Sequence, residues 1–171
     1  MSEGALIEQY RLMHARGEVF TGRSLLPVAW RVYDAVRAHG ARSLLDYGCG
    51  QGRQYDRYRL HEWWGVPRPR LYDPAVARYA ARPEGSFDGV ICSDVLEHVP
   101  RDELDGVLTD CFGFARGFVF FSICCRPARK SLPNGMNCHV TIEEPAWWQD
   151  RLQGFQQAHG RGAALYLAFS P

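Results

Sequence analysis

The segment LLDYGCGQG, residues 44–52, constrains the fold most, because a short apolar run there ends in an aspartate and three alternating glycines. An apolar run of this length, bounded by glycines, is typical of a buried parallel strand that enters a tight turn. Gly48, Gly50 and Gly52 leave the backbone bare at the carboxyl end of that strand, which is where doubly wound sheets bind ligands. The segment therefore predicts an α/β fold with a ligand site directly after this strand.

Three further segments repeat the pattern of an apolar strand followed by a turn. They are RLYDP at 70–74, SFDGVICSD at 86–94 and GFVFFSICC at 117–125. Helical spacing of apolar residues indicates helices at 6–16, ended by Gly17, at 25–39, with Ser24 as N-cap and Gly40 as stop, and from Pro100 to about 116. Strands that alternate with helices predict a mostly parallel sheet covered on both faces.

The carboxyl-terminal third of the chain is less regular. A long irregular segment follows residue 125, AWWQDRL at 146–152 predicts a short helix, and 154–170 is compatible with a hairpin around HGRG. We therefore expect a Rossmann-like three-layer α/β/α sandwich with six or seven strands and a C-terminal antiparallel hairpin. One domain spans 1–171, with N-terminal cover helices at 1–40, a ligand-binding core at 41–125, and an acceptor loop, helix and hairpin at 126–171.

Composition narrows the functional classes. The 171 residues are 46% hydrophobic, enough for one domain with a substantial core, and the formal net charge of +1 provides no overall field for nucleic acid or an anionic membrane. No apolar stretch approaches the roughly 20 residues of a membrane span, and the first residues do not form a secretion signal. We expect a cytoplasmic protein, monomeric or homodimeric, with six reduced cysteines.

The glycine pattern departs from two common phosphate-binding motifs. A dinucleotide fingerprint would place its third glycine at position 53, which is Arg53, and a phosphate-binding loop would continue with Gly-Lys-Ser/Thr. The segment instead resembles the first motif of the class I S-adenosylmethionine-dependent methyltransferases: apolar strand, acidic residue, alternating glycines. The resemblance implies S-adenosylmethionine (SAM) as cofactor and S-adenosylhomocysteine (SAH) as product.

Two later segments extend the resemblance, which covers 25–125 well and the tail loosely. Asp73 ends the second strand, where the family has a carboxylate that accepts hydrogen bonds from the ribose. SFDGVICSDVLEHV is similar to the family's fourth strand and the turn after it, especially in the branch that methylates quinones and small molecules. The resemblance implies that Asp46 faces the ammonium side of the cofactor. The full set of implied cofactor residues is Asp46, Tyr47, Gly48, Cys49, Gly50, Gly52, Asp73, Pro74, Ser93, Asp94 and Glu97.

The chain departs from the family in one place. Only thirteen residues separate Asp73 from Phe87, too few for a helix, a third strand and an adenine-binding loop. We expect the third strand to be reduced or missing. Adenine recognition then falls to the backbone, to Pro74 and its neighbours, or to aromatic stacking.

Histidines are the candidate bases, because an acceptor hydroxyl, thiol or protonated nitrogen must lose a proton, and the histidine pKa lies near neutrality. His139, in the loop after the last apolar strand, is preferred over His98, and Asn137 is expected to orient the substrate or the ring. Arg126, in a basic cluster with Arg129 and Lys130, is compatible with an acidic group on the acceptor. The N-terminal helix, with Tyr10 and His14, resembles the family's lid and would exclude water on closing.

No metal is expected. Cys124, Cys125, Cys138 and His139 have suitable atoms for zinc, but adjacent cysteines on a strand point to opposite faces and chelate poorly. The acceptor is expected to be a small molecule methylated on oxygen or nitrogen, because Ser93-Asp94-Val95-Leu96 differs from the motif of enzymes that methylate exocyclic amines of nucleic acids. Three alternatives remain open: a SAM- or SAH-binding regulatory or scaffold subunit, a methyltransferase of a macromolecule that acts with a partner, and a different sulfonium reaction on the same fold.

Overall fold

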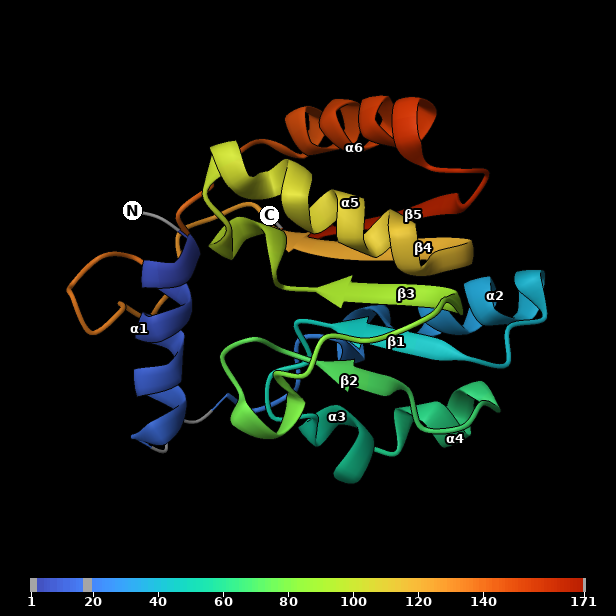
Figure 1. Ribbon diagram of the computed structural model, residues 1–171, viewed down its shortest axis with the longest axis horizontal. Coiled ribbons are helices and arrows are strands. Elements are labelled where there is room, and N and C mark those ends of the chain that lie inside the picture. Colours follow the sequence, from blue (N-terminus) through green and yellow to red (C-terminus); the bar gives the residue numbers. More distant parts are fainter. Residues whose placement is uncertain (1–2, 17–19, 171) are drawn as a thin grey trace.

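A five-stranded parallel sheet in the order β2-β1-β3-β4-β5 forms the centre of the structure (Figure 1). The structure is a computed structural model that describes residues 3–16 and 20–170. The strands are β1 Leu44–Tyr47, β2 Arg70–Tyr72, β3 Phe87–Ser93, β4 Ala115–Cys124 and β5 Ala164–Ser170. All four neighbouring pairs run parallel. Every carboxyl end of a strand therefore lies at the same edge of the sheet.

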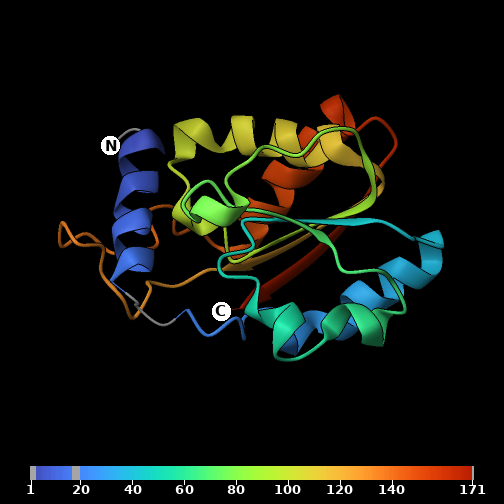
Figure 2. The ribbon, with the colours of Figure 1, turned by 60° about the horizontal axis from the view of Figure 1, so that its bottom comes forward.

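Helices cover both faces of the sheet and its carboxyl edge. Figure 2 shows α5 and α6 on one face, α2, α3 and α4 on the other, and α1 standing at the strand ends. The helices are α1 Glu3–Ala15, α2 Ala29–His39, α3 Arg53–Asp56, α4 Leu60–Trp64, α5 Leu104–Phe114 and α6 Pro145–His159. Short 3-10 turns are η1 Leu26–Val28, η2 Ala77–Tyr79, η3 Leu96–His98 and η4 Arg101–Glu103. None of the helices in the described ranges is long and apolar enough to cross a membrane.

Strand β4 shows how the sequence builds two hydrophobic cores from one strand. Phe118 and Phe120 pack into the core under α2 and α4, whereas Val119 and Phe121 pack into the core under α5 and α6. The alternation is the period of two that a strand imposes on its side chains. All four side chains are fully buried. A strand that is apolar on both faces fits only a sheet covered on both sides, as the sequence predicts.

The predicted strands before residue 125 are all present, and the predicted helices are present with shifted bounds. The helix expected at 25–39 begins with the 3-10 turn η1, and α2 then ends at Gly40, whose φ of 56° gives the left-handed cap that glycine favours. Ser24 is not an N-cap, because η1 has no side-chain cap. The stop expected at Gly17 lies outside the described residues.

The predicted C-terminal hairpin is wrong. Residues 154–159 continue α6, which is longer than the short helix expected, and β5 pairs parallel to β4. Trp148, Leu152 and Phe155 are buried at a spacing of four and three residues, the helical period that places one face on the sheet. Gly154 lies within the helix, on its exposed face, and does not interrupt it.

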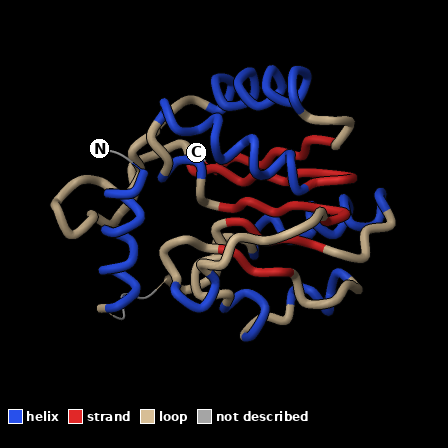
Figure 3. Tube along the Cα trace, in the orientation of Figure 1, coloured by secondary structure: helices blue, strands red, loops and turns tan. Residues whose placement is uncertain are grey.

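The sheet has five strands where six or seven were expected. The connection from β2 to β3 has the 3-10 turn η2 as its regular element, in keeping with the short segment between Asp73 and Phe87. Figure 3 shows loops gathered at the carboxyl edge, among them the long segment between β4 and α6. Strand order reverses between β1 and β3, and this switch point is where doubly wound sheets leave a crevice for a ligand.

Gly89 in β3 tests the packing between the sheet and α2. A Cβ atom at Gly89 would lie 2.3 Å from Cζ of Phe118 and 2.9 Å from Cδ2 of Leu44. We expect Gly89→Ala to lower the free energy of unfolding by about 1–3 kcal/mol, because the fully buried Phe118 ring must move. Gly154→Ala is the control in α6, where a Cβ meets nothing within 4 Å, and it should stabilise by about 0.5–1 kcal/mol. Urea unfolding measures both, and equal stability of the two variants would contradict the packing described.

Candidate ligand-binding site

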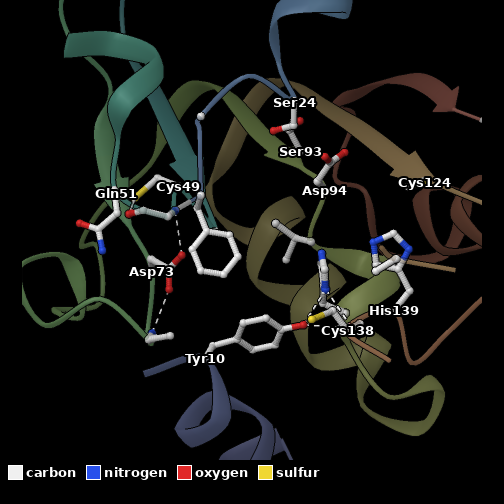
Figure 4. A pocket seen from close by; sticks show the side chains of 18 of the residues that line it. Tyr10, Ser24, Cys49, Gln51, Asp73, Ser93, Asp94, Cys124, Cys138 and His139 are labelled. Atoms are coloured by element: carbon white, nitrogen blue, oxygen red, sulfur yellow. Dashed lines mark hydrogen bonds between the residues drawn. The ribbon is translucent and has the colours of Figure 1, made fainter. Parts of the chain in front are cut away.

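A cavity of about 560 Å³ lies at the carboxyl ends of the strands, next to the switch point. Its volume falls within the roughly 300–1,000 Å³ of small-molecule sites. Figure 4 shows Asp73 with Cys49 and Gln51 on one side, His139 and Cys124 on the other, and Tyr10 from α1 between them. The cavity thus joins the glycine segment to the long loop after β4.

Most of the residues that the sequence singles out come together around this cavity. It is lined by Tyr10, His14, Asp46, Tyr47, Gly48, Cys49, Gly50, Asp73, Pro74, Ser93, Asp94, His98, Arg126 and His139. Gly52, Glu97 and Asn137 do not line it. Gly52 packs behind the loop, where a Cβ would lie 2.7 Å from Leu71. Glu97 is buried and Asn137 half-buried behind the cavity wall. Both hold backbone groups of the wall through hydrogen bonds.

The loop after β1 depends on two glycines for different reasons. Gly48 has φ of 77°, and a Cβ there would lie 2.3 Å from Cγ2 of Val95 in the turn after β3. Gly50 has φ of 54°, and a Cβ there would meet no protein atom within 4 Å. Gly48 therefore allows close packing of two turns, while Gly50 leaves an open backbone beside the cavity that a ligand can approach.

Asp73 holds this loop in place. Its Oδ2 accepts a hydrogen bond from the Gly50 amide at 2.8 Å, and its Oδ1 accepts one from the Ala75 amide at 2.9 Å. Burial raises the pKa of the carboxyl, and the two backbone hydrogen bonds counteract the effect. Each carboxylate oxygen has a second lone pair, so Asp73 can still accept hydrogen bonds from hydroxyl groups in the cavity.

Asp46, the acidic residue of β1, is 2% exposed. Its Oδ2 accepts a hydrogen bond of 2.7 Å from Nε2 of Gln54 on α3, which also donates to the Cys49 carbonyl. Burial raises the pKa of the Asp46 carboxyl to about 6. Gln54 was not predicted from the sequence, although a buried carboxylate needs a donor and the next helix is the nearest source.

The histidines lie at the other end of the cavity. Nδ1 of His98 is 2.9 Å from the Cys138 carbonyl and 2.7 Å from the Tyr10 hydroxyl, which itself donates to Cys138 at 2.9 Å. Burial, with a smaller effect of His139, lowers the pKa of His98 to about 4. His98 is therefore neutral at physiological pH, and α1 is tied to it through Tyr10.

Asn137 organises the loop that carries His139. Its amide bonds to both backbone groups of Ala128 at 2.9 Å, and its Oδ1 also accepts the His139 amide at 2.9 Å. Nδ1 of His139 lies 2.5 Å from the carbonyl of Arg126. Asn137 thus orients the histidine through the backbone and does not face the cavity itself.

Two acidic residues follow β3. Glu97 is fully buried, and its Oε1 accepts the Cys124 amide at 2.8 Å. Burial, and next the nearby charge of Asp94, raise the pKa of Glu97 to about 8. Asp94 has φ of 53°, uncommon for a residue other than glycine, and its carboxylate is hydrogen-bonded by Ser24. Ser93 shares a hydrogen bond of 2.6 Å with Ser122 of β4.

Residues 20–25 and Gln51 are the part of the site that sequence reasoning mostly missed. Phe20, Thr21, Gly22, Arg23, Ser24 and Leu25 line the cavity together with Leu6 and Ile7 of α1. Nε2 of Gln51 donates to Nδ1 of His14 at 3.0 Å, and burial lowers the pKa of His14. Arg126, Arg129 and Lys130 also line the cavity and place positive charge at its edge. The N-terminal segment therefore forms one wall of the cavity.

Comparison with known proteins shows a fold similarity and no sequence relative. No protein-family model matches the chain, and no curated protein matches its sequence. Among solved structures, DhpI in complex with SAH matches with a TM-score of 0.57 at 16% identity, over 90% of this chain and 88% of DhpI. This similarity shows a shared fold.

Two further structures match less closely. Magnesium protoporphyrin IX methyltransferase (ChlM) from Synechocystis PCC 6803, with bound SAH, has a TM-score of 0.39 at 19% identity, over 66% of this chain and 64% of its own. An O-methyltransferase family protein from Burkholderia thailandensis has a TM-score of 0.37 at 14% identity, over 83% and 48%. With TM-scores this low, neither structure adds evidence about the fold.

Asp46→Asn tests the buried carboxyl of the site. Because burial raises the pKa of Asp46 from 3.8 to about 6, the native state binds its proton more tightly than the unfolded chain does. Stability of the wild type should therefore fall as pH rises from about 4 to about 6, by up to about 3 kcal/mol. The asparagine side chain of the variant keeps an oxygen for Gln54, has no proton to lose, and should lack this loss of stability. Urea unfolding of both proteins at pH 4 and pH 7 measures the difference, and identical pH profiles would refute it.

Proposed function

We propose that the protein transfers a methyl group from SAM to an oxygen or nitrogen of a small-molecule acceptor. The observation that carries the proposal is the open backbone at Gly50, held by Asp73 at the switch point, in a cavity that also holds His98 and His139. Such a backbone admits a ligand that a side chain would exclude. The fold shared with DhpI, solved with SAH, supports the same proposal.

The residues of the first half of the cavity fit SAM. Asp73 would accept hydrogen bonds from the ribose hydroxyls with its remaining lone pairs, and Gly50 would border the cofactor backbone. Asp46 and Asp94 place carboxylates where the resemblance expects the methionine end of the cofactor. Pro74 and Ala75, which line the cavity, are the candidates for adenine contact in the absence of a third strand from the β2–β3 connection.

When bound, SAM supplies a methyl group on a positive sulfonium, ready for in-line displacement. The chain's part is to align an acceptor, exclude water and take up the acceptor's proton. Nδ1 of both histidines lies against a backbone carbonyl, so Nε2 of each is the atom left to accept a proton. His139 is the favoured base, with His98 beside it at a ring separation of 4.8 Å.

A small acceptor fits the enclosure of the site. Helix α1 and residues 20–25 wall the cavity with the apolar side chains of Leu6, Ile7 and Phe20, while Arg126 offers a positive charge to an acidic group. We propose that Tyr10 and His14 also border the acceptor, because both line the cavity from α1. SAH binding without turnover on any acceptor would instead favour a SAM-binding regulatory subunit.

Gly50→Val tests cofactor binding, with Gly40→Val as a matched control. Both glycines have a left-handed φ, 54° and 56°, and at both a Cβ meets nothing within 4 Å. The backbone strain of valine is thus similar, but only position 50 borders the cavity. We expect calorimetric titration to show SAH binding to the wild type and to Gly40→Val, and none to Gly50→Val.

NADH and ATP serve as ligand controls in the same titration. Equal SAH affinity in Gly50→Val would show that the glycine segment does not border the cofactor. Tighter binding of NADH or ATP than of SAH would reject SAM as the cofactor.

His139→Ala tests the acceptor side once an acceptor has been found by screening. We expect turnover to fall roughly 10²-fold or more, the contribution of a general base, while SAH affinity stays unchanged. Steady-state kinetics and calorimetry measure the two effects separately. An unchanged turnover number would remove His139 from the mechanism.

A further inference from the structure

Three potential metal ligands meet at the wall of the cavity, at its acceptor end. One ligand atom each of Glu97, His98 and His139 lies within 4.8 Å of the other two. Glu97 and His98 come from the turn η3 after β3, and His139 comes from the loop after β4. Residues distant in the sequence are thus brought to one point by the parallel pairing of β3 with β4.

Hydrogen bonds fix the tautomers of both rings. The Tyr10 hydroxyl has one proton, which it donates to the Cys138 carbonyl, so Nδ1 of His98 faces two oxygens that can accept and is itself the donor. Nδ1 of His139 likewise donates to the carbonyl of Arg126. In the neutral form of each ring, the lone pair is then on Nε2. Histidines that bind metals usually have this arrangement, with the other ring nitrogen donating to a backbone carbonyl or a carboxylate.

Glu97 provides an independent indication of a missing partner. Its side chain is fully buried, and its Oε1 is bound to the Cys124 amide at 2.8 Å. Its Oε2 is also buried and has no hydrogen-bond partner. A buried carboxyl oxygen without a hydrogen-bond partner is costly whether or not the group is protonated, and coordination of a metal ion in exchange for the proton is one of the few ways to satisfy it.

We propose that Glu97, His98 and His139 bind a divalent first-row transition metal ion such as Zn²⁺. Two imidazoles and one carboxylate form a ligand set known for catalytic zinc, which keeps a position open for substrate. A bound ion with ligands at about 2.0–2.2 Å would draw the three atoms to roughly 3.3 Å from one another. This small closure is available to His139, which is half-exposed on a loop.

The proposed site differs from the one considered from the sequence. Cys124 and Cys138 line the same cavity, but the carboxylate and the two rings converge without them. His98 and His139 line the cavity while Glu97 lies behind it, so the open coordination positions of the ion would face the cavity.

The site also suggests a class of acceptor, an inference that rests on the proposed function. An acceptor hydroxyl that coordinates the ion would release its proton to solvent more readily and keep the electron pair that then bonds to the methyl carbon. The sulfonium sulfur would keep the electrons of the broken bond and become a neutral thioether. With the ion bound, Nε2 of each histidine is a ligand and cannot accept a proton, so His139 would act on the acceptor through the ion in place of acting as the general base. Acceptors with an oxygen that can bind a metal are therefore favoured over amines.

Metal binding is tested on the whole chain, without cofactor or acceptor. Protein stripped with EDTA is titrated with Co²⁺, followed by visible absorption, and with Zn²⁺ and Mg²⁺ by calorimetry. We expect one Co²⁺ or Zn²⁺ per chain, little binding of Mg²⁺, and no cobalt–thiolate charge-transfer band. Glu97→Gln and His139→Ala should each raise Kd at least about 100-fold, more than the loss of an outer-shell partner does. His14→Ala, in the same cavity but outside the cluster, should bind as the wild type does.

Several results would overturn the proposal: no binding of Co²⁺ or Zn²⁺, a thiolate band, unchanged affinity in Glu97→Gln or His139→Ala, or equal loss in His14→Ala. Circular dichroism checks that each variant is folded. His139 is half-buried on a loop, so His139→Ala should leave the hydrophobic core intact even if Glu97→Gln does not. SAH titration of the metal-free protein separates the two hypotheses. SAH binding without metal binding rejects the metal site alone, and metal binding without SAH binding rejects the proposed cofactor alone.

Discussion

The hydrogen bond between the Asp73 carboxylate and the Gly50 amide is the constraint on which the site depends. It fixes the loop after β1 to the end of β2, while Gly48 packs the same loop against Val95 in the turn after β3. Three strand ends are thereby locked together at the switch point of the sheet. The left-handed conformation of Gly50, with φ of 54°, is one that glycine adopts without strain, and the Asp73 carboxylate binds the amide in that conformation, so the glycines and Asp73 form one structural unit.

Buried acidic groups divide the cavity into two chemically different ends. Asp46 is satisfied by Gln54 and sits beside the loop, with a pKa of about 6. Glu97 has a hydrogen-bond partner at only one oxygen and lies beside His98 and His139, and burial raises its pKa to about 8. Strongly perturbed groups gathered at one cavity are typical of functional sites. The first end suits a cationic ligand, and the second suits an ion or a proton.

The part of the cavity around Gly50 and Asp73 could be predicted from the sequence because its signals are local. Gly48 and Asp73 each directly follow a strand, Gly50 lies in the turn after the first of them, and strand ends meet at one edge of a parallel sheet. The cluster of Glu97, His98 and His139 could not be predicted, because the proximity of His139 to Glu97 depends on the path of a long loop that Asn137 orders. The predicted C-terminal hairpin was wrong because residues 154–159 continue α6, where burial of Trp148, Leu152 and Phe155 on one face outweighs the weak helix propensity of Gly154. Gln51 and Gln54 carry no sequence signal of their own.

Tyr10 connects α1 to the histidine end of the cavity. Its hydroxyl contacts both Nδ1 of His98 and the Cys138 carbonyl. A swing of α1 wide enough to exchange ligands would break both contacts and admit water to the ring. The same movement that opens the molecule would thus release the support of His98, and the return of Tyr10 would restore it. Access to the cavity past α1 and the hydrogen-bonded support of His98 by Tyr10 therefore exclude one another.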